Sequence, residues 1–214
     1  MKINFIESSF ESVDLKEKKK KKLTKFIFLL MKWNKKFNII SIKNPESIIN
    51  KHIIDSINII EHIKIPGKVL DIGTGAGFPS IPLAIYKNTV YFYLLEPKIK
   101  KISFIRYIIS SLKIKNVNIY HLRLENFYLK EKFTCIISRA FVDLHKLLNF
   151  FKTSNLKKCT IILMNSYINI QIVKRFFFKK ISNIKIVNVT NTKNIVGHRN
   201  LIILKIGIKE KKKI

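Results

Sequence analysis

Apolar residues recur at three- and four-residue intervals over residues 15–38 and again over residues 44–60. In the first segment they share one face and lysines occupy the other, which predicts an amphipathic helix. The second segment opens with Asn44, Pro45 and Glu46, which are an N-cap candidate, a proline at the first helical position and an early acid. The pattern stops near Pro66-Gly67, so we expect two helices ahead of the first strand.

From residue 68 onward, short apolar runs alternate with helical patterns. They predict, in order, strand 68–72, helix 79–86, strand 90–96, helix 98–113, strand 117–121, strand 133–138, helix 142–151 and strand 160–164. This alternation is typical of a doubly wound α/β fold, with a mostly parallel sheet and helices on both faces. Residues 184–190 and 200–208 predict two further strands, paired antiparallel at one edge.

The residues after the first predicted strand indicate a ligand-binding turn. The strand ends at Asp71 and runs into Gly73, Gly75 and Gly77, whose missing Cβ atoms let a cofactor approach the backbone. The next strand ends in Glu96, and a carboxylate there can accept from both hydroxyls of a ribose. The glycine spacing differs from that of dinucleotide-binding loops, and a nearby proline has no N–H for a pyrophosphate. Either acid alone could simply cap a strand end, but together they favour a nucleoside cofactor.

Residues at the ends of the later strands are further binding candidates. Leu124 and Glu125 follow the third strand, where Glu125 could lie near an adenine amine. Arg139 closes the fourth strand, where a cation leaving an apolar core needs an acid or a ligand beside it. Each could equally be a satisfied surface charge. Their expected position at one edge of the sheet favours a site.

Composition bounds the possible functions. A chain of 214 residues with 47% hydrophobic residues suits one α/β catalytic domain and excludes general disorder. No apolar run approaches the roughly 20 residues that cross a bilayer, and the first ten residues do not resemble a signal peptide, so we expect a cytoplasmic protein that does not bind membranes. Cys135 and Cys159 lie in apolar runs without metal-ligand spacing, so we expect buried hydrophobes and no metal site.

The net charge of +29, from 42 Lys and Arg against 13 Asp and Glu, is compatible with a nucleic-acid partner. The excess is mostly lysine and accompanies abundant Ile, Asn and Phe, as expected when a compositionally biased genome favours A/T-rich codons. Charge alone is therefore not diagnostic of RNA. The run Lys16–Lys22 is better explained as a solvated helix end or arm than as a segment dedicated to RNA binding.

Several segments together resemble the bacterial small-subunit (16S) ribosomal RNA guanine-N7 methyltransferases, also called the glucose-inhibited division protein B family. The matching segments cover most of residues 25–205 and are Lys32 to Asn38, His52 to Ser56, the glycine loop with Phe78 to Ala84, Leu94 to Glu96 with Lys100, Lys101 and Phe104, and Ile137 to Phe141. The resemblance implies a class I S-adenosylmethionine-dependent methyltransferase (Rossmann-like) fold. We expect residues 1–66 to form a helical extension packed on the core, 67–208 the methyltransferase domain and 209–214 a basic tail.

By this resemblance, S-adenosyl-L-methionine would be bound through Gly73, Phe78, Leu124 with Glu125, and Arg139. The glycine spacing and the acids at the strand ends indicate that Asp71, Gly75 and Glu96 support the same pocket. The expected partner is small-subunit ribosomal RNA or the assembling small subunit, and we expect a monomer. Family members usually carry Lys-Gly where this chain has Asn165-Ser166, and a glycine where it has Ser80; the first difference bears on RNA affinity more than on cofactor binding.

The expected chemistry needs no acid–base residue. Guanine N7 already holds an in-plane lone pair, so catalysis rests on positioning, and we nominate no catalytic residue. His52, Asp55 and Trp33 are candidates for orienting or stacking on the base, although a His on an amphipathic helix is more often a packed or surface residue. Two other readings stay open: a methyltransferase acting on another substrate, and a non-catalytic RNA-binding protein of ribosome assembly.

Overall fold

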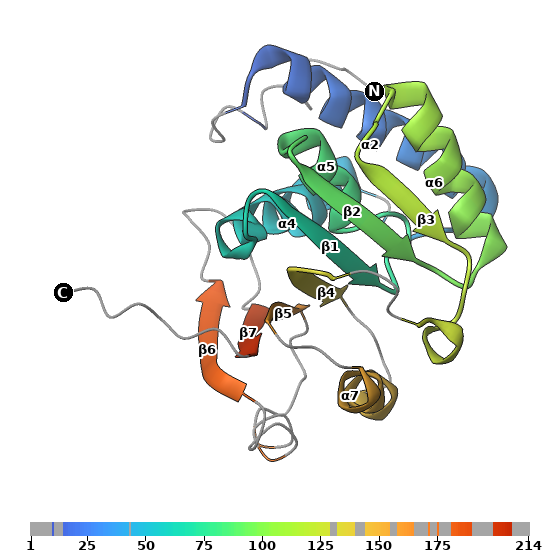
Figure 1. Ribbon diagram of the computed structural model, residues 1–214. Helices are drawn as coiled ribbons and strands as arrows, with labels where there is room; N and C mark the ends of the chain where they lie inside the picture. Colours follow the sequence, from blue (N-terminus) through green and yellow to red (C-terminus); the bar gives the residue numbers. More distant parts are fainter. Residues whose placement is uncertain are drawn as a thin grey trace.

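The computed structural model describes residues 10, 15–42, 44–128, 132–139, 144–154, 158–164, 171, 175, 181–189 and 199–206. Its centre is a seven-stranded sheet in the order β3-β2-β1-β4-β5-β7-β6 (Figure 1). The strands are β1 Gly67–Ile72, β2 Val90–Leu95, β3 Val117–Tyr120, β4 Cys135–Arg139, β5 Cys159–Met164, β6 Ile181–Val189 and β7 Arg199–Ile206. β1 to β5 are mutually parallel, and β7 runs antiparallel to both β5 and β6. The predicted doubly wound, mostly parallel sheet is therefore confirmed.

The helices also follow the predicted order. Two segments precede the sheet: α2 Glu17–Phe37, and a continuous helical path made of α3 Pro45–Ile48, the π-helix η1 Ile49–Ile54, α4 Asp55–Asn58 and the 3₁₀ turn η2 Ile59–His62. The others are α5 Ser80–Tyr86, α6 Ile99–Leu112, the 3₁₀ turn η3 Leu124–Asn126 and α7 Leu144–Thr153. Asn44 caps α3 as expected, because its side-chain oxygen accepts from the N–H of Glu46 at 2.9 Å.

Both faces of the central strands are buried, and successive residues contribute to different layers of the core. Val69 packs in a cluster with residues of α2, α5 and α6, whereas its neighbour Leu70 packs with Leu147 and Phe150 of α7. Figure 1 shows the same layering, with α2, α4, α5 and α6 on one face of the sheet and α7 on the other. Burial on both sides explains why these strands are continuously apolar in sequence rather than alternating.

The last two strands pair antiparallel as predicted, but β7 inserts beside β5, so that of the pair only β6 forms the edge of the sheet. Cys135 and Cys159 are buried free thiols, and burial raises the pKa of Cys159 to about 12, consistent with a role as small hydrophobes. Within the described ranges, no helix has the length and apolarity needed to cross a membrane. The domain boundaries after residues 66 and 208 stay a prediction, and residues 209–214 lie outside the described chain.

Candidate cofactor site

The glycine loop connects β1 to α5 at the carboxyl edge of the parallel strands. Gly73, Gly75 and Gly77 have φ values of 72°, 64° and 91°, a region that residues with a Cβ rarely adopt. The N–H groups of Gly73 and Thr74 donate to the carbonyl of Leu95 at 2.9 and 3.2 Å, which ties the loop to the end of β2. The loop therefore needs glycine for its backbone shape and presents a main-chain surface beside the tip of β2.

Glu96 lies beneath this surface with 3% of its area exposed. Its Oε2 accepts from the N–H of Gly75 at 2.9 Å, and its Oε1 accepts from the N–H of Lys98 at 3.0 Å. A carboxylate offers about four acceptor positions, so both oxygens keep capacity for a ligand hydroxyl. The carboxylate is thus already oriented by the loop that it would share with a bound nucleoside.

Asp71 supports the loop from within the core. Its side chain is fully buried, and the Thr74 hydroxyl donates to Oδ2 at 2.7 Å. Burial raises the pKa of Asp71 to about 7, and this effect outweighs the lowering by interactions with Ser80 and Thr74 and by the charge of Arg139. Ser80, which stands where the family usually has glycine, is buried at the start of α5.

Replacement of Asp71 by asparagine should change how stability depends on pH. Between about pH 4 and 7 the folded wild-type protein binds a proton that the unfolded chain has released, so its free energy of unfolding falls as pH rises. Over this range the free energy of unfolding should fall by roughly 4 kcal/mol in total, and the decline is complete above pH 7. Asp71→Asn should lack this decline, as measured by urea unfolding from pH 4 to 8. The exposed variant Glu46→Gln should keep the wild-type slope, and an equal slope in Asp71→Asn would contradict the assignment.

Arg139, at the end of β4, joins the sheet to the N-terminal helical segment. Its Nη2 donates to the carbonyl of Lys51 at 2.7 Å and contacts Nδ1 of His52 at 2.5 Å. Its guanidinium carbon lies 5.9 Å from the centre of the Phe78 ring, and the His52 ring stacks on Phe78 at 4.7 Å. Three segments that are distant in sequence therefore meet around Phe78, directly after the glycine loop.

This contact defines how the His52 ring is held. A guanidinium can only donate, so Nδ1 of His52 is the acceptor in this contact. Trp33, by contrast, packs against Phe37, Phe104 and Tyr107 with ring centres 5.0 to 5.6 Å apart. The structure thus favours a packing role for Trp33 and brings His52 to the proposed site.

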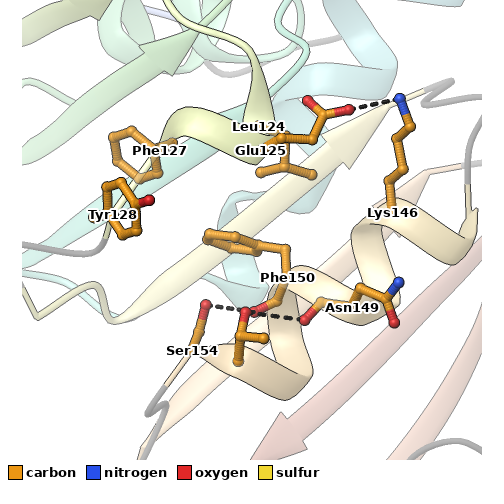
Figure 2. Close-up of a pocket in the computed structure, with 9 residues that line it drawn as sticks. Leu124, Glu125, Phe127, Tyr128, Lys146, Asn149, Phe150 and Ser154 are labelled. Atoms are coloured by element: carbon orange, nitrogen blue, oxygen red, sulfur yellow. Dashed lines mark hydrogen bonds and ion pairs between the residues drawn. The ribbon is translucent and has the colours of Figure 1, made fainter.

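Leu124 and Glu125 lie in a hollow of about 470 Å³ between η3 and α7, which the glycine loop does not line. Figure 2 shows Glu125 joined to Lys146 of α7, with Phe127, Tyr128 and Phe150 forming the aromatic side of the hollow. The Glu125 and Lys146 side chains are 2.6 Å apart, and this hydrogen bond lowers the pKa of Glu125. Leu124 is buried. Their role in holding the cofactor stays a prediction.

The structure adds neighbours of the site that the sequence did not identify as site residues. The carbonyl of Lys51 fixes Arg139, and Lys101 of α6 places its Nζ 3.7 Å from where a Cβ on Gly75 would be. Such through-space neighbours leave no local signal in sequence. Asn165 and Ser166, the positions that differ from the family pattern, lie outside the described residues. Within the described ranges, no group of three His, Cys, Asp or Glu side chains could hold a metal ion.

Solved structures share this architecture at low sequence identity. A SAM-dependent methyltransferase from Aquifex aeolicus superposes with a TM-score of 0.56 and 16% identity, covering 75% of this chain and 93% of that one. TYW2 of M. jannaschii, solved with AdoMet, has a TM-score of 0.56 and 18% identity, covering 72% of this chain and 74% of that one. These similarities confirm the class I methyltransferase fold.

Sequence comparison is more specific. Two curated relatives carry the name ribosomal RNA small subunit methyltransferase G. One from Legionella pneumophila (strain Corby) is 41% identical over 60% of this chain and 61% of its own length. One from Vibrio vulnificus (strain CMCP6) is 38% identical over 65% of this chain and 66% of its own length. The alignment with the Legionella protein therefore spans about three fifths of that relative. The model of the family described as rRNA small subunit methyltransferase G (GidB) matches residues 19–201. The resemblance seen in the sequence is confirmed, and the chain belongs to the rRNA small subunit methyltransferase G family.

Proposed function

We propose that this protein transfers the methyl group of S-adenosyl-L-methionine to N7 of a guanine in small-subunit (16S) ribosomal RNA. The observation that carries the proposal is the buried carboxylate of Glu96 held beneath a glycine loop with positive φ angles. Membership of the family and the names of the relatives support the RNA substrate. Small-subunit RNA or the assembling subunit is the proposed partner, with the protein acting as a monomer in the cytoplasm.

The proposed cofactor fits the residues present. The backbone of Gly73 and Gly75 gives room for the nucleoside, and Glu96 has acceptor capacity for the two ribose hydroxyls. Phe78 and Arg139 lie beside the loop, while Leu124 and Glu125 are proposed to contact the adenine from η3. When bound, the cofactor would supply an electrophilic methyl group on a sulfonium. Asp71 keeps the loop in place by accepting from the Thr74 hydroxyl.

The protein's own part in the reaction is positioning. The lone pair of guanine N7 needs no deprotonation, so a residue must orient the base rather than remove a proton. His52 is the best placed candidate, since it stacks on Phe78 and is held by Arg139. A ring fixed in this way loses little further entropy when a base docks against it.

A direct consequence is a weak dependence of the chemical step on pH. With saturating cofactor and RNA, the single-turnover rate should be nearly flat from about pH 6.5 to 9, because no general base has to lose a proton. Burial raises the pKa of Asp71 to about 7, so ionisation of this side chain beneath the loop can bend the plot of rate against pH. The variant Asp71→Asn is measured in parallel, and a bend that is absent from this variant is due to Asp71 rather than to the chemical step. A rate that climbs tenfold per pH unit in both proteins would contradict N7 as the nucleophile.

The product tests the assignment. Purified protein, S-adenosylmethionine with a labelled methyl group and unmodified small-subunit RNA should yield 7-methylguanosine by mass spectrometry, and the modified site should be cleaved by reduction followed by aniline. Labelled RNA that resists this cleavage would indicate methylation of an amine or a ribose. Cofactor binding without methyl transfer to this RNA would favour a methyltransferase with another substrate. Absence of cofactor binding would favour a non-catalytic RNA-binding protein of ribosome assembly.

A further inference from the structure

A lysine-rich groove of about 380 Å³ lies at the opposite end of the strands from the glycine loop. Its lining includes Asn88 just before β2, Tyr91 near the start of β2 and Asn116 just before β3. Because β1, β2 and β3 are parallel, these positions mark the amino edge of the sheet, whereas Glu96 follows β2 at the carboxyl edge. The groove is therefore spatially separate from the proposed cofactor site.

Two walls of different origin supply the lysines. The start of α2 contributes Lys16, Lys18, Lys19 and Lys22, and the turn between α6 and β3 contributes Lys113 and Lys115. We call the groove that they line the lysine groove. These are six of the twelve residues that line it, and no acidic residue does so within the described chain. Lysine and arginine make up 42 of the 214 residues overall. Codon bias in the genome would spread lysines over the whole surface, so the concentration of lysines in one groove indicates more than codon bias.

The arrangement is electrostatically unfavourable without an anion. Glu17 is the acid in the first turn of α2, and lysines surround it in these N-terminal turns, where the helix dipole favours negative charge. Partial burial and the charge of Lys18 lower the pKa of Lys22. Polyanion phosphates between the two walls would offset both effects, because each could interact with lysines from either side.

The lining residue Asn116 is held in place before any ligand binds. The side-chain amide of Asn116 donates to the carbonyls of Val90, Ala84 and Lys87 at 2.9, 3.2 and 3.3 Å. These contacts hold the connection between α5 and β2 against the start of β3. Tyr91 is 50% exposed beside the lysines and offers a ring and a hydroxyl to a sugar or an unstacked base.

We propose that the lysine groove binds the phosphate backbone of small-subunit RNA at a second point, remote from the nucleotide that is methylated. The proposal rests on the proposed function for its choice of RNA. Contact at two ends of the domain would set the orientation of the enzyme on a folded RNA without reading its sequence. It also gives Lys16–Lys22 a function that a solvated helix end does not have.

The test compares two pairs of lysines on α2. The double variant Lys18→Gln with Lys22→Gln removes two charges from the groove. The control, Lys32→Gln with Lys36→Gln, removes two charges at the same spacing from exposed positions outside the groove. Glutamine maintains helix propensity. Affinity of the full-length protein for small-subunit RNA is measured by fluorescence anisotropy between about 50 and 200 mM salt. The groove pair should bind about tenfold more weakly and show a salt slope smaller by one to two units, whereas the control pair should resemble wild type.

A second variant, Lys113→Gln with Lys115→Gln, tests the other wall and should give the same loss. Cofactor affinity should be unchanged in all three proteins, which separates this inference from the proposed function. If wild type methylates the RNA and both groove pairs bind it like the control pair, the inference is overturned while the function stands. Loss of binding to an acidic protein or to anionic vesicles, with RNA affinity unaltered, would also overturn it.

Discussion

Replacement of Gly73 by valine is expected to lower the affinity for S-adenosylmethionine by more than about 100-fold, equivalent to roughly 3 kcal/mol. Gly73 has a φ of 72°, and its N–H is bonded to the carbonyl of Leu95 at the tip of β2. A β-branched residue is strained in this conformation, and its two methyl groups would occupy space next to the main chain that the nucleoside needs. Calorimetry measures the affinity, and the loss of the ligand-induced rise in melting temperature provides a second readout.

The neighbouring glycines separate exclusion of the ligand from damage to the fold. A Cβ on Gly75 would meet Lys101 Nζ at an ordinary 3.7 Å, so Gly75→Ala should cost only the backbone strain of about 1 kcal/mol and still weaken binding. A Cβ on Gly77 would lie 2.5 Å from Cγ1 of Ile81, so Gly77→Ala should mainly destabilise the protein. Tight binding by Gly73→Val, or equal preference for NAD, would refute the proposed site.

Truncation of Arg139 to alanine is expected to reduce cofactor affinity or turnover by about 10- to 100-fold, because hydrogen bonds from charged groups are worth about 1.5–3 kcal/mol. The change removes the donor to the Lys51 carbonyl and to His52, together with the contact on the Phe78 ring. His52 then loses the partner that fixes its orientation. Arg139→Lys keeps the charge but lacks the planar fork, so we expect only partial recovery.

The salt dependence of RNA binding decides between two roles for Arg139. A group that positions the cofactor should leave the slope of log affinity against log salt nearly unchanged, because no phosphate contact is lost. Arg123→Ala, an exposed arginine near η3, serves as the control for removal of one charge. A slope smaller by about one unit with normal cofactor affinity in Arg139→Ala would identify a phosphate contact instead.

The sequence by itself determined the order of the elements, the doubly wound sheet, the glycine loop and the family. These features depend on local patterns: apolar periodicity, an N-cap at Asn44, and glycines where the backbone needs positive φ. The acids that end β1 and β2 were also identifiable, since parallel strands bring their carboxyl ends to one edge of the sheet. Their different partners were not, because only the folded loop brings the Thr74 hydroxyl to Asp71 and the N–H of Gly75 to Glu96.

Only the tertiary structure decided which distant residues meet. Arg139 and His52 are 87 residues apart in sequence and touch because the π-helical segment packs over the end of β4. Glu125 meets Lys146 because α7 covers the other face of the sheet beside η3. The lysine groove likewise forms because α2 lies over the turn that carries Lys113 and Lys115. Sequence periodicity shows which face of an element is buried, whereas the neighbours of that face are set by chain topology and by the packing of both layers on one sheet.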